Sequence, residues 1–156
     1  MNTNIARKAF LDLHNEHRAA TAKGEVLIKN GKYARKCPMM KKLNYDCDLE
    51  KAAYATAQQC KPADPNTNNE NWFTTKTTGT NKKAAAEKAV ASWYEEISNG
   101  SMQQEEGSQN LLMPDLHVTH FARMVWSTND RMGCAIHKCN KWCGLSVWPG
   151  ESMSQD

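Results

Sequence analysis

The stretch that decides the fold is His120-Phe121-Ala122-Arg123-Met124-Val125-Trp126, followed after four residues by Arg131-Met132-Gly133-Cys134-Ala135. Apolar residues at helical spacing predict a short helix over 118–126. Alternating and continuous apolar runs then predict two strands, 131–138 and 142–148, joined as a hairpin through residues 139–141. The chain is therefore expected to close with a helix and an antiparallel hairpin, followed by a polar tail over 149–156.

The residues before this stretch are dominated by helical patterns. Three- and four-residue apolar spacing predicts helices over 4–23, capped by Thr3 or Asn4 and ended by Gly24; over 49 to about 59, capped by Asp48; and over about 81–98, starting at Asn81. The segments 25–46, 61–80 and 99–116 are expected to be irregular, with 61–80 a long polar loop. Helices and antiparallel strands in separate runs predict an α+β domain with helices packed on a sheet.

Length and composition restrict the class of protein. A chain of 156 residues suits a single domain over 1–156, with a core at about 5–148. The formal net charge of +3 does not by itself indicate a nucleic-acid partner. No apolar run is long enough for a membrane-spanning helix, so the protein is not expected to be embedded in a membrane.

Six cysteines carry more information: Cys37, Cys47, Cys60, Cys134, Cys139 and Cys143. An even number in a small chain predicts three disulfides, with connectivity open among 15 pairings, and an extracellular, secreted protein. The alternative is six buried thiols in a cytosolic protein. Residues 1–10 lack the apolar segment of a signal peptide, so the sequence is expected to begin after a removed leader. Asn99-Gly100-Ser101 is the one glycosylation sequon.

Three stretches together resemble the CAP superfamily of cysteine-rich secretory, antigen 5 and pathogenesis-related 1 proteins. They are 10–18 (FLDLHNEHR), 89–97 (AVASWYEEI) and 120–135, which is similar to the first CAP signature. The run 43–48 (LNYDCD) is similar to the nematode branch of Ancylostoma-type secreted proteins. The resemblance implies a secreted, disulfide-stabilised three-layer α–β–α sandwich.

The second CAP signature is degraded in this chain. It normally ends in a Cys-x-Tyr-x-Pro-x-Gly-Asn-like run, whereas residues 143–150 read CGLSVWPG. Hookworm relatives that antagonise host integrins, the platelet and neutrophil inhibitors, are similar in carrying degraded signatures, and the short length is similar to the platelet-inhibitor type.

The resemblance also implies a cleft of two His and two Glu that can hold a divalent metal. His120, Glu96 and Glu70 match three positions, and Asp64 stands where the second histidine is expected. Because imidazole suits zinc better than carboxylate does, the set Glu70, Glu96 and His120 is expected to bind zinc weakly, and no cofactor is expected to be required. His117 is a candidate replacement for the missing histidine. The competing interpretation is a structural polar network that joins the helices to the loop.

The sequence contains little that supports an enzymatic function. A zinc protease needs His-Glu-x-x-His, but His14 and His17 are only three apart. No Gly-x-Ser-x-Gly turn is present for a serine hydrolase, and paired cysteines are not nucleophiles. No catalytic residue is therefore assigned.

Two neighbouring segments are candidates for receptor binding. Lys23-Gly24-Glu25 is similar to a Lys-Gly-Asp integrin-binding tripeptide with one extra methylene, although Gly24 also has the ordinary role of a helix stop. The basic stretch 29–42, with Lys32, Arg35 and Lys36, can bind an acidic surface or be a solvated loop. The leading hypothesis is a non-enzymatic secreted protein that binds host adhesion receptors, integrins first. The alternatives are a lipid or sterol carrier and a metal-dependent hydrolase.

Overall fold

The structure is a computed structural model. It describes residues 4–29, 31–61, 70–75, 81–102 and 114–139, together with the backbone of 143–149.

One sheet of four strands lies at the centre of the molecule. The strands are β1 (Asn44–Tyr45), β2 (Asn71–Thr75), β3 (Arg131–Lys138) and β4 (Cys143–Pro149), in the spatial order β1-β3-β4-β2. β1 runs parallel to β3, whereas β3–β4 and β4–β2 are antiparallel. The predicted hairpin is confirmed, with Lys138 opposite Cys143. The prediction of an unbroken loop over 61–80 is wrong, because Asn71–Thr75 adds an edge strand to β4.

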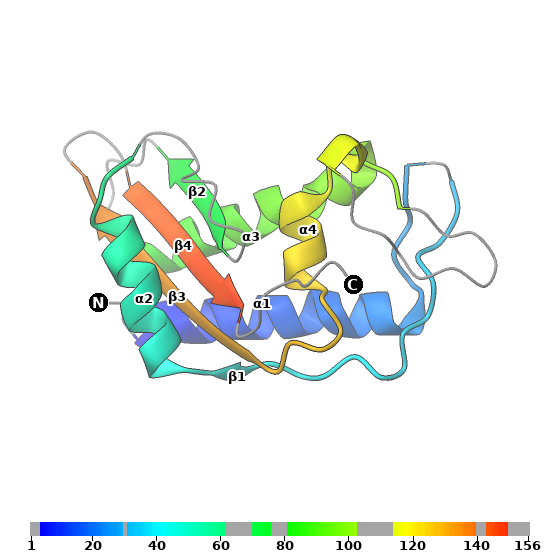
Figure 1. Ribbon diagram of the computed structural model, residues 1–156, viewed down its shortest axis with the longest axis horizontal. Helices are drawn as coiled ribbons and strands as arrows, with labels where there is room; N and C mark the ends of the chain where they lie inside the picture. The colour runs from blue at the N-terminus through cyan, green and yellow to red at the C-terminus, as the bar shows by residue number, and fades with distance from the viewer. Residues whose placement is uncertain are drawn as a thin grey trace.

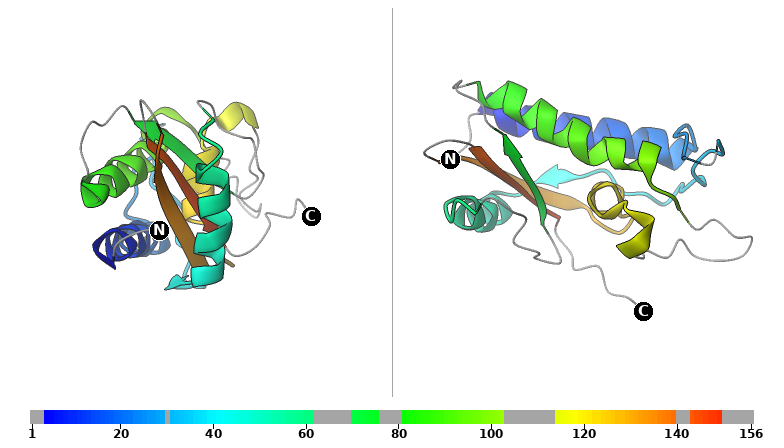
Figure 2. Two further views of the ribbon diagram at one scale, coloured as in Figure 1. Left: turned by 90° about the vertical axis from the view of Figure 1, so that its left-hand side faces the viewer. Right: turned by 90° about the horizontal axis from the view of Figure 1, so that it is seen from above.

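Helices cover both faces of this sheet. They are α1 (Asn4–Lys23), α2 (Cys47–Ala57), α3 (Lys82–Asn99) and α4 (Thr119–Met124), with a single 3₁₀ turn, η1, at Pro114–Leu116. α1 and α3 lie together on one face and α2 lies on the other (Figures 1 and 2). The expected three-layer α–β–α sandwich is thus confirmed.

The helix boundaries follow from local chemistry. Gly24 ends α1 with φ of 73°, a conformation that favours glycine. The Asn81 side chain accepts the Ala84 N–H and begins α3, as predicted. The cap of α2 is Asp46 rather than the expected Asp48, because the Asp46 carboxylate accepts the N–H groups of residues 48 and 49.

The core is divided unequally between the two faces. The larger apolar cluster lies between the sheet and α1, α3 and α4 and contains Phe10, Trp93 and Phe121, all nearly inaccessible to solvent. A smaller cluster under α2 contains Ala53, Ala57, Trp72 and Ala135. Gly133 allows α2 to approach closely, since a Cβ there would lie 2.2 Å from the Glu50 nitrogen.

The expected set of three disulfides is corrected by the structure. Cys60 and Cys139 form a disulfide, whereas Cys37 and Cys47 are free thiols, so the chain cannot hold three disulfides. Cys47 is exposed at the start of α2, and Cys134 is buried in β3. The side chain of Cys143 lies outside the described residues.

In the part of the chain that the structure describes, no helix has the length and apolar character required to cross a membrane. Residues 150–156 of the expected tail lie outside the described residues, and β4 reaches Pro149. The sequon residue Asn99 is the exposed last residue of α3, and its glycosylation stays a prediction.

Candidate functional site

The predicted cleft residues Glu96 and His120 are in direct contact. Glu96 comes from α3 and His120 from α4, and 2.6 Å separates Glu96 Oε1 from His120 Nδ1. The other carboxylate oxygen of Glu96 accepts the backbone N–H groups of His120 (2.8 Å) and Phe121 (3.0 Å). Val118, at the N-cap position of α4, offers no side-chain hydrogen bond. Glu96 therefore caps α4 from a neighbouring helix.

His120 is held from a second side by an aromatic ring. Its imidazole lies nearly parallel to the Trp93 indole, with an interplanar angle of 8° and ring centroids 6.5 Å apart. The Trp93 indole N–H donates to the Trp72 carbonyl in β2. The side chains of Glu96 and His120 each remain 25% exposed, so the pair lies at the edge of the core and is reachable by solvent.

Glu70 is fully buried just before β2. The Thr56 hydroxyl in α2 donates to its carboxylate at 3.0 Å, and the Arg123 guanidinium donates to its backbone carbonyl at 2.6 Å. The next residue, Asn71, donates from its amide to the His120 carbonyl at 2.9 Å. These bonds tie the start of β2 to both α2 and α4.

The polar groups named above form one set, which we call the cleft network: Glu70, Asn71, Glu96, His120 and Arg123. Among the described residues, the ligand atoms of Glu70, Glu96 and His120 do not gather within 4.8 Å of one another. The carboxylates hold backbone and side-chain donors instead, so these three residues do not form a ready metal centre in this arrangement. Asp64 lies outside the described residues, and the weak zinc site stays a prediction.

The remaining histidines occupy separate places. His14 is buried in α1, where its Nδ1–H donates to the Phe10 carbonyl at 2.8 Å, and burial lowers its pKa to about 4. His17 stacks on the Tyr94 ring with centroids 3.7 Å apart. His117 is exposed before α4, with φ of 55°. His14 and His17 thus serve the packing of α1 against α3.

Arg18 is a structural residue that sequence reasoning did not single out. Its buried guanidinium donates five hydrogen bonds to four backbone carbonyls, those of Lys41, Met124, Trp126 and Asn129. Burial lowers its pKa to about 10. The only sequence signal was its place at the end of the quoted 10–18 stretch.

The receptor-binding candidates Lys23, Gly24 and Glu25 lie together at the end of α1. The Gly24 N–H donates to the Thr21 carbonyl and the Glu25 N–H to the Ala20 carbonyl, both at 3.0 Å. The side chains of Lys23 and Glu25 are exposed. The tripeptide is therefore a fixed turn with one cation and one carboxylate in solvent.

A short hairpin follows this turn directly. The Ala34 N–H donates to the Val26 carbonyl at 2.7 Å, and the Ile28 N–H donates to the Lys32 carbonyl at 2.8 Å. Val26, Ile28 and Ala34 are buried on the inner side. Exposed residues alternate with them: Leu27, Lys29, Lys32, Tyr33, Arg35 and Lys36. We call the turn and this hairpin, the described residues of 23–36, the hairpin face.

Comparison with known proteins identifies the family. The model of the cysteine-rich secretory protein family, CAP, matches residues 11–148. The chain belongs to the CAP family. The CAP match begins within α1, includes all of α3, α4 and β3, and ends one residue before the end of β4; the described cleft residues lie within it.

Nematode proteins are among the relatives of this CAP domain. The chain is 30% identical over 149 residues to Ancylostoma secreted protein from Ancylostoma caninum, covering 88% of this chain and 34% of that protein. It is 30% identical over 138 residues to hookworm platelet inhibitor 1 from the same organism, covering 86% of this chain and 57% of that protein. The chain thus spans about a third of the length of Ancylostoma secreted protein and somewhat more than half of the length of hookworm platelet inhibitor 1.

Solved structures confirm the fold. A crystal structure of NaASP2 with Zn²⁺ has a TM-score of 0.83 at 32% identity, with 95% of this CAP domain and 80% of that chain covered. The crystal structure of hookworm platelet inhibitor has a TM-score of 0.72 at 27% identity, with 99% of this CAP domain and 74% of that chain covered. The sandwich architecture is thus shared with nematode members of the family.

Proposed function

We propose that this CAP domain is a secreted, non-enzymatic protein that binds host cell-adhesion receptors, integrins first, and inhibits the adhesion of platelets or leukocytes. The relationship to hookworm platelet inhibitor 1, at 30% identity over 138 residues, supports this proposal. The observation that carries it is the hairpin face, where recognition chemistry is concentrated outside the cleft network.

The Glu25 carboxylate is the proposed point of attachment. A receptor-bound divalent cation takes carboxylate oxygens as ligands, and Glu25 is exposed on a turn fixed by two backbone hydrogen bonds. A fixed turn loses little conformational entropy on binding, which favours affinity. Lys23, one residue before the glycine, adds the cation of the tripeptide.

The neighbouring hairpin supplies the contact area. Leu27 and Tyr33 pair across the hairpin and are 55% and 62% exposed. Arg35 and Lys36 are exposed beside them. Tyrosine and arginine are enriched among the residues that dominate binding energy in protein interfaces. Apolar anchors with a cationic rim suit a receptor surface that is acidic around an apolar pocket.

The turn and the hairpin are packed against each other. A Cβ on Gly24 would lie 2.9 Å from the Lys36 Cγ and 3.0 Å from the Ala34 carbonyl oxygen. The Cys37 N–H donates to the Ala22 carbonyl at 2.9 Å, which anchors the far end of the hairpin to α1. The carboxylate and the apolar pair are therefore presented as one rigid surface.

The alternative of a lipid carrier has weaker support. An open groove between α1 and residues 40–42 has a volume of about 260 Å³ and is lined in part by Ala19, Ala22 and Met40. This volume lies below the range of roughly 300–1,000 Å³ that is typical of small-molecule pockets. A sterol would need more apolar enclosure than this groove offers.

An adhesion assay tests the proposal. Platelets and neutrophils are offered fibrinogen, collagen and an integrin-independent surface in the presence of the protein. We expect dose-dependent block on the integrin ligands alone, with a loss of about tenfold or more in potency for Glu25→Gln and retained potency for Glu25→Asp. The matched control is Glu16→Gln, which removes an exposed carboxylate that lies on α1 and outside the hairpin face.

Two results would overturn the proposal. If micromolar protein blocks adhesion on none of the surfaces, receptor antagonism is wrong, and delipidated protein is then titrated with a sterol to examine the carrier alternative. If Glu25→Gln and Glu16→Gln inhibit as well as the parent protein, the receptor is not engaged through Glu25.

A further inference from the structure

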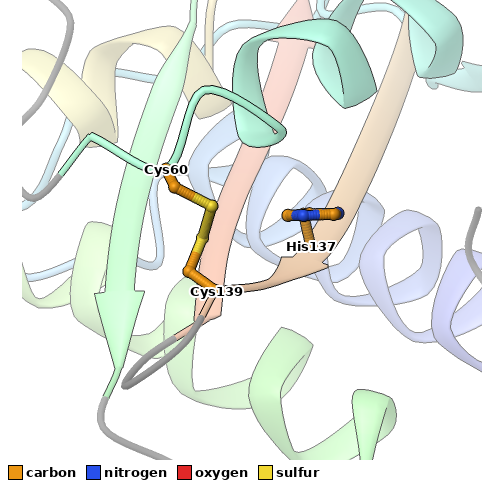
Figure 3. Close-up of side chains that lie close together, drawn as sticks. All are labelled: Cys60, His137 and Cys139. Atoms are coloured by element: carbon orange, nitrogen blue, oxygen red, sulfur yellow. A yellow bond between two sulfur atoms is a disulfide. The ribbon is translucent and has the colours of Figure 1, made fainter.

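We propose that Cys60, His137 and Cys139 form a zinc site when the disulfide between the two cysteines is reduced. The site is separate from the cleft network and from the hairpin face, and it does not depend on the proposed receptor function. The sulfur and ring-nitrogen atoms of the three residues lie within 4.8 Å of one another (Figure 3).

The fold brings the three ligands together from two elements. Cys60 follows the end of α2, where its backbone adopts φ of 50°. His137 lies near the end of β3 and Cys139 just beyond it. The ligand atoms of His137 and Cys139 lie close together although Cys139 is one residue beyond the strand, and the turn after α2 brings Cys60 to them.

The alternation of side chains along β3 keeps the buried Cys134 away from the proposed zinc site. Ala135 packs in the cluster under α2, whereas Cys134 belongs to the cluster on the α1 and α3 side. His137 lies two residues after Ala135 on β3 and therefore points to the same face of the sheet as Ala135. Cys134 is therefore on the opposite face of the sheet and does not compete for the proposed site.

Opening the disulfide requires an external reductant. A dithiol transfers two electrons and two protons to the cystine, the S–S bond breaks into two thiols, and the dithiol closes into its own disulfide. Zn²⁺ then binds the two sulfurs as thiolates and releases their two protons. Neutral His137 supplies the third ligand through a ring nitrogen, and water takes the fourth position.

The donor set selects the type of metal. Two thiolates and one imidazole are soft ligands that suit zinc, whereas magnesium and calcium require oxygen donors. Two thiolates also balance the charge of Zn²⁺, so the occupied site is neutral. Neutrality matters because Cys139 is only 7% exposed, and burial of an uncompensated charge is costly.

The surroundings help to orient the imidazole. The Tyr54 ring of α2 meets the His137 ring edge-on, with centroids 5.6 Å apart. A bound zinc ion would connect the end of α2 to the end of β3, as the disulfide does now. Zinc is thus expected to restore to the reduced protein part of the stability that loss of the covalent link removes.

Zinc titration of the oxidised and reduced protein tests this inference. A trialkylphosphine reduces the disulfide and becomes the phosphine oxide with oxygen from water. A competing chelator then reports zinc affinity, and Co²⁺ substitution reports thiolate ligation through its charge-transfer and ligand-field absorption. We expect the reduced protein to bind one more zinc equivalent than the oxidised protein, with thiolate-to-cobalt absorption and a higher melting temperature in zinc.

Variants separate this site from other metal ligands. His137→Gln keeps the disulfide, so its fold is verified in the oxidised state, and after reduction we expect about tenfold or greater loss of zinc affinity. His17→Gln and Cys47→Ser are controls with a histidine and a thiol from other parts of the fold, and both should retain the affinity. Equal zinc binding by oxidised and reduced protein, or unchanged affinity in His137→Gln, would overturn the proposal.

Discussion

The cleft network and the hairpin face use their polar side chains in opposite ways. In the cleft network, the Glu96 carboxylate caps α4 and the Arg123 guanidinium holds the carbonyl of Glu70. On the hairpin face, Lys23, Glu25 and Arg35 are exposed. The first region stabilises the sandwich, whereas the second presents charge and apolar surface to solvent.

This difference suggests where selection for binding can act without loss of the fold. Changing a group that holds a helix end leaves buried donors or acceptors without partners, which costs stability. Changing the exposed Glu25 or Leu27 on the hairpin face leaves the buried residues Val26, Ile28 and Ala34, which hold the hairpin from its inner side, in place. A family signature can therefore be retained for stability while recognition changes elsewhere.

The largest expected loss is for Arg18→Met, because Arg18 is buried and, like the residues of the cleft network, uses its polar groups to hold the backbone. The substitution keeps the approximate side-chain length but removes the donors to four carbonyls, of which those of Met124 and Asn129 accept buried bonds. Each buried acceptor left unpaired costs about 1–3 kcal/mol, so we expect a loss of about 3–5 kcal/mol in the free energy of unfolding. Urea denaturation at pH 7 measures it, and an unchanged midpoint contradicts the assignment.

Acid is expected to destabilise the protein at α1, where His14 is buried. The pKa of buried His14 falls from 6.5 to about 4 in the folded protein, so the unfolded chain binds this proton more readily. Stability is therefore fully present above about pH 6.5 and is lost as pH falls toward about 4, by roughly 3 kcal/mol in total. Burial also lowers the pKa of His17, which adds a loss of the same sign.

Unfolding free energies measured between pH 7 and pH 4 check this dependence. His14→Gln should flatten the slope, whereas His117→Gln, at an exposed histidine, should leave it in place. Hydrogen bonds from the Leu49 and Asp48 N–H groups lower the pKa of the Asp46 carboxyl, so its contribution is lost only at more acidic pH. A slope that persists in His14→Gln would assign the acid sensitivity to other groups.

A smaller loss is expected for Glu96→Ala. The variant removes the cap of α4 and the contact to His120, and a lost cap costs about 0.5–2 kcal/mol. With the charged hydrogen bond included, we expect about 2–3 kcal/mol. Glu95→Ala is the matched control, because Glu95 is the exposed neighbour on α3. Equal unfolding free energies for the two variants would show that Glu96 does not stabilise α4.

The helices could be predicted because their signals are local. Gly24 and Asn81 mark the ends of α1 and α3 by their own backbone and side-chain chemistry. β2 was missed because its five residues are polar and aromatic in a polar context, and only pairing with distant β4 makes them a strand. Propensity cannot reveal a strand that depends on long-range pairing.

The candidate site was predictable only in part. The residue types of Glu96 and His120 could be taken from family motifs, but their mutual bond depends on how α3 and α4 pack. Disulfide pairing is likewise a property of the folded chain: the spacing of six cysteines did not distinguish Cys60–Cys139 from the other possibilities. The proximity of His137 to that pair has the same origin.

The smallest expected effect on stability is on the hairpin face. Tyr33→Ala should change the free energy of unfolding by no more than about 0.5 kcal/mol, because Tyr33 is 62% exposed. Ile28→Val, on the buried side of the same hairpin, should cost about 1 kcal/mol although it removes only one methylene. If Tyr33→Ala destabilises the protein more than Ile28→Val, the exposed side of the hairpin contributes to the fold. Its exposed side chains are then not free to change for recognition, and the contrast with the cleft network is lost.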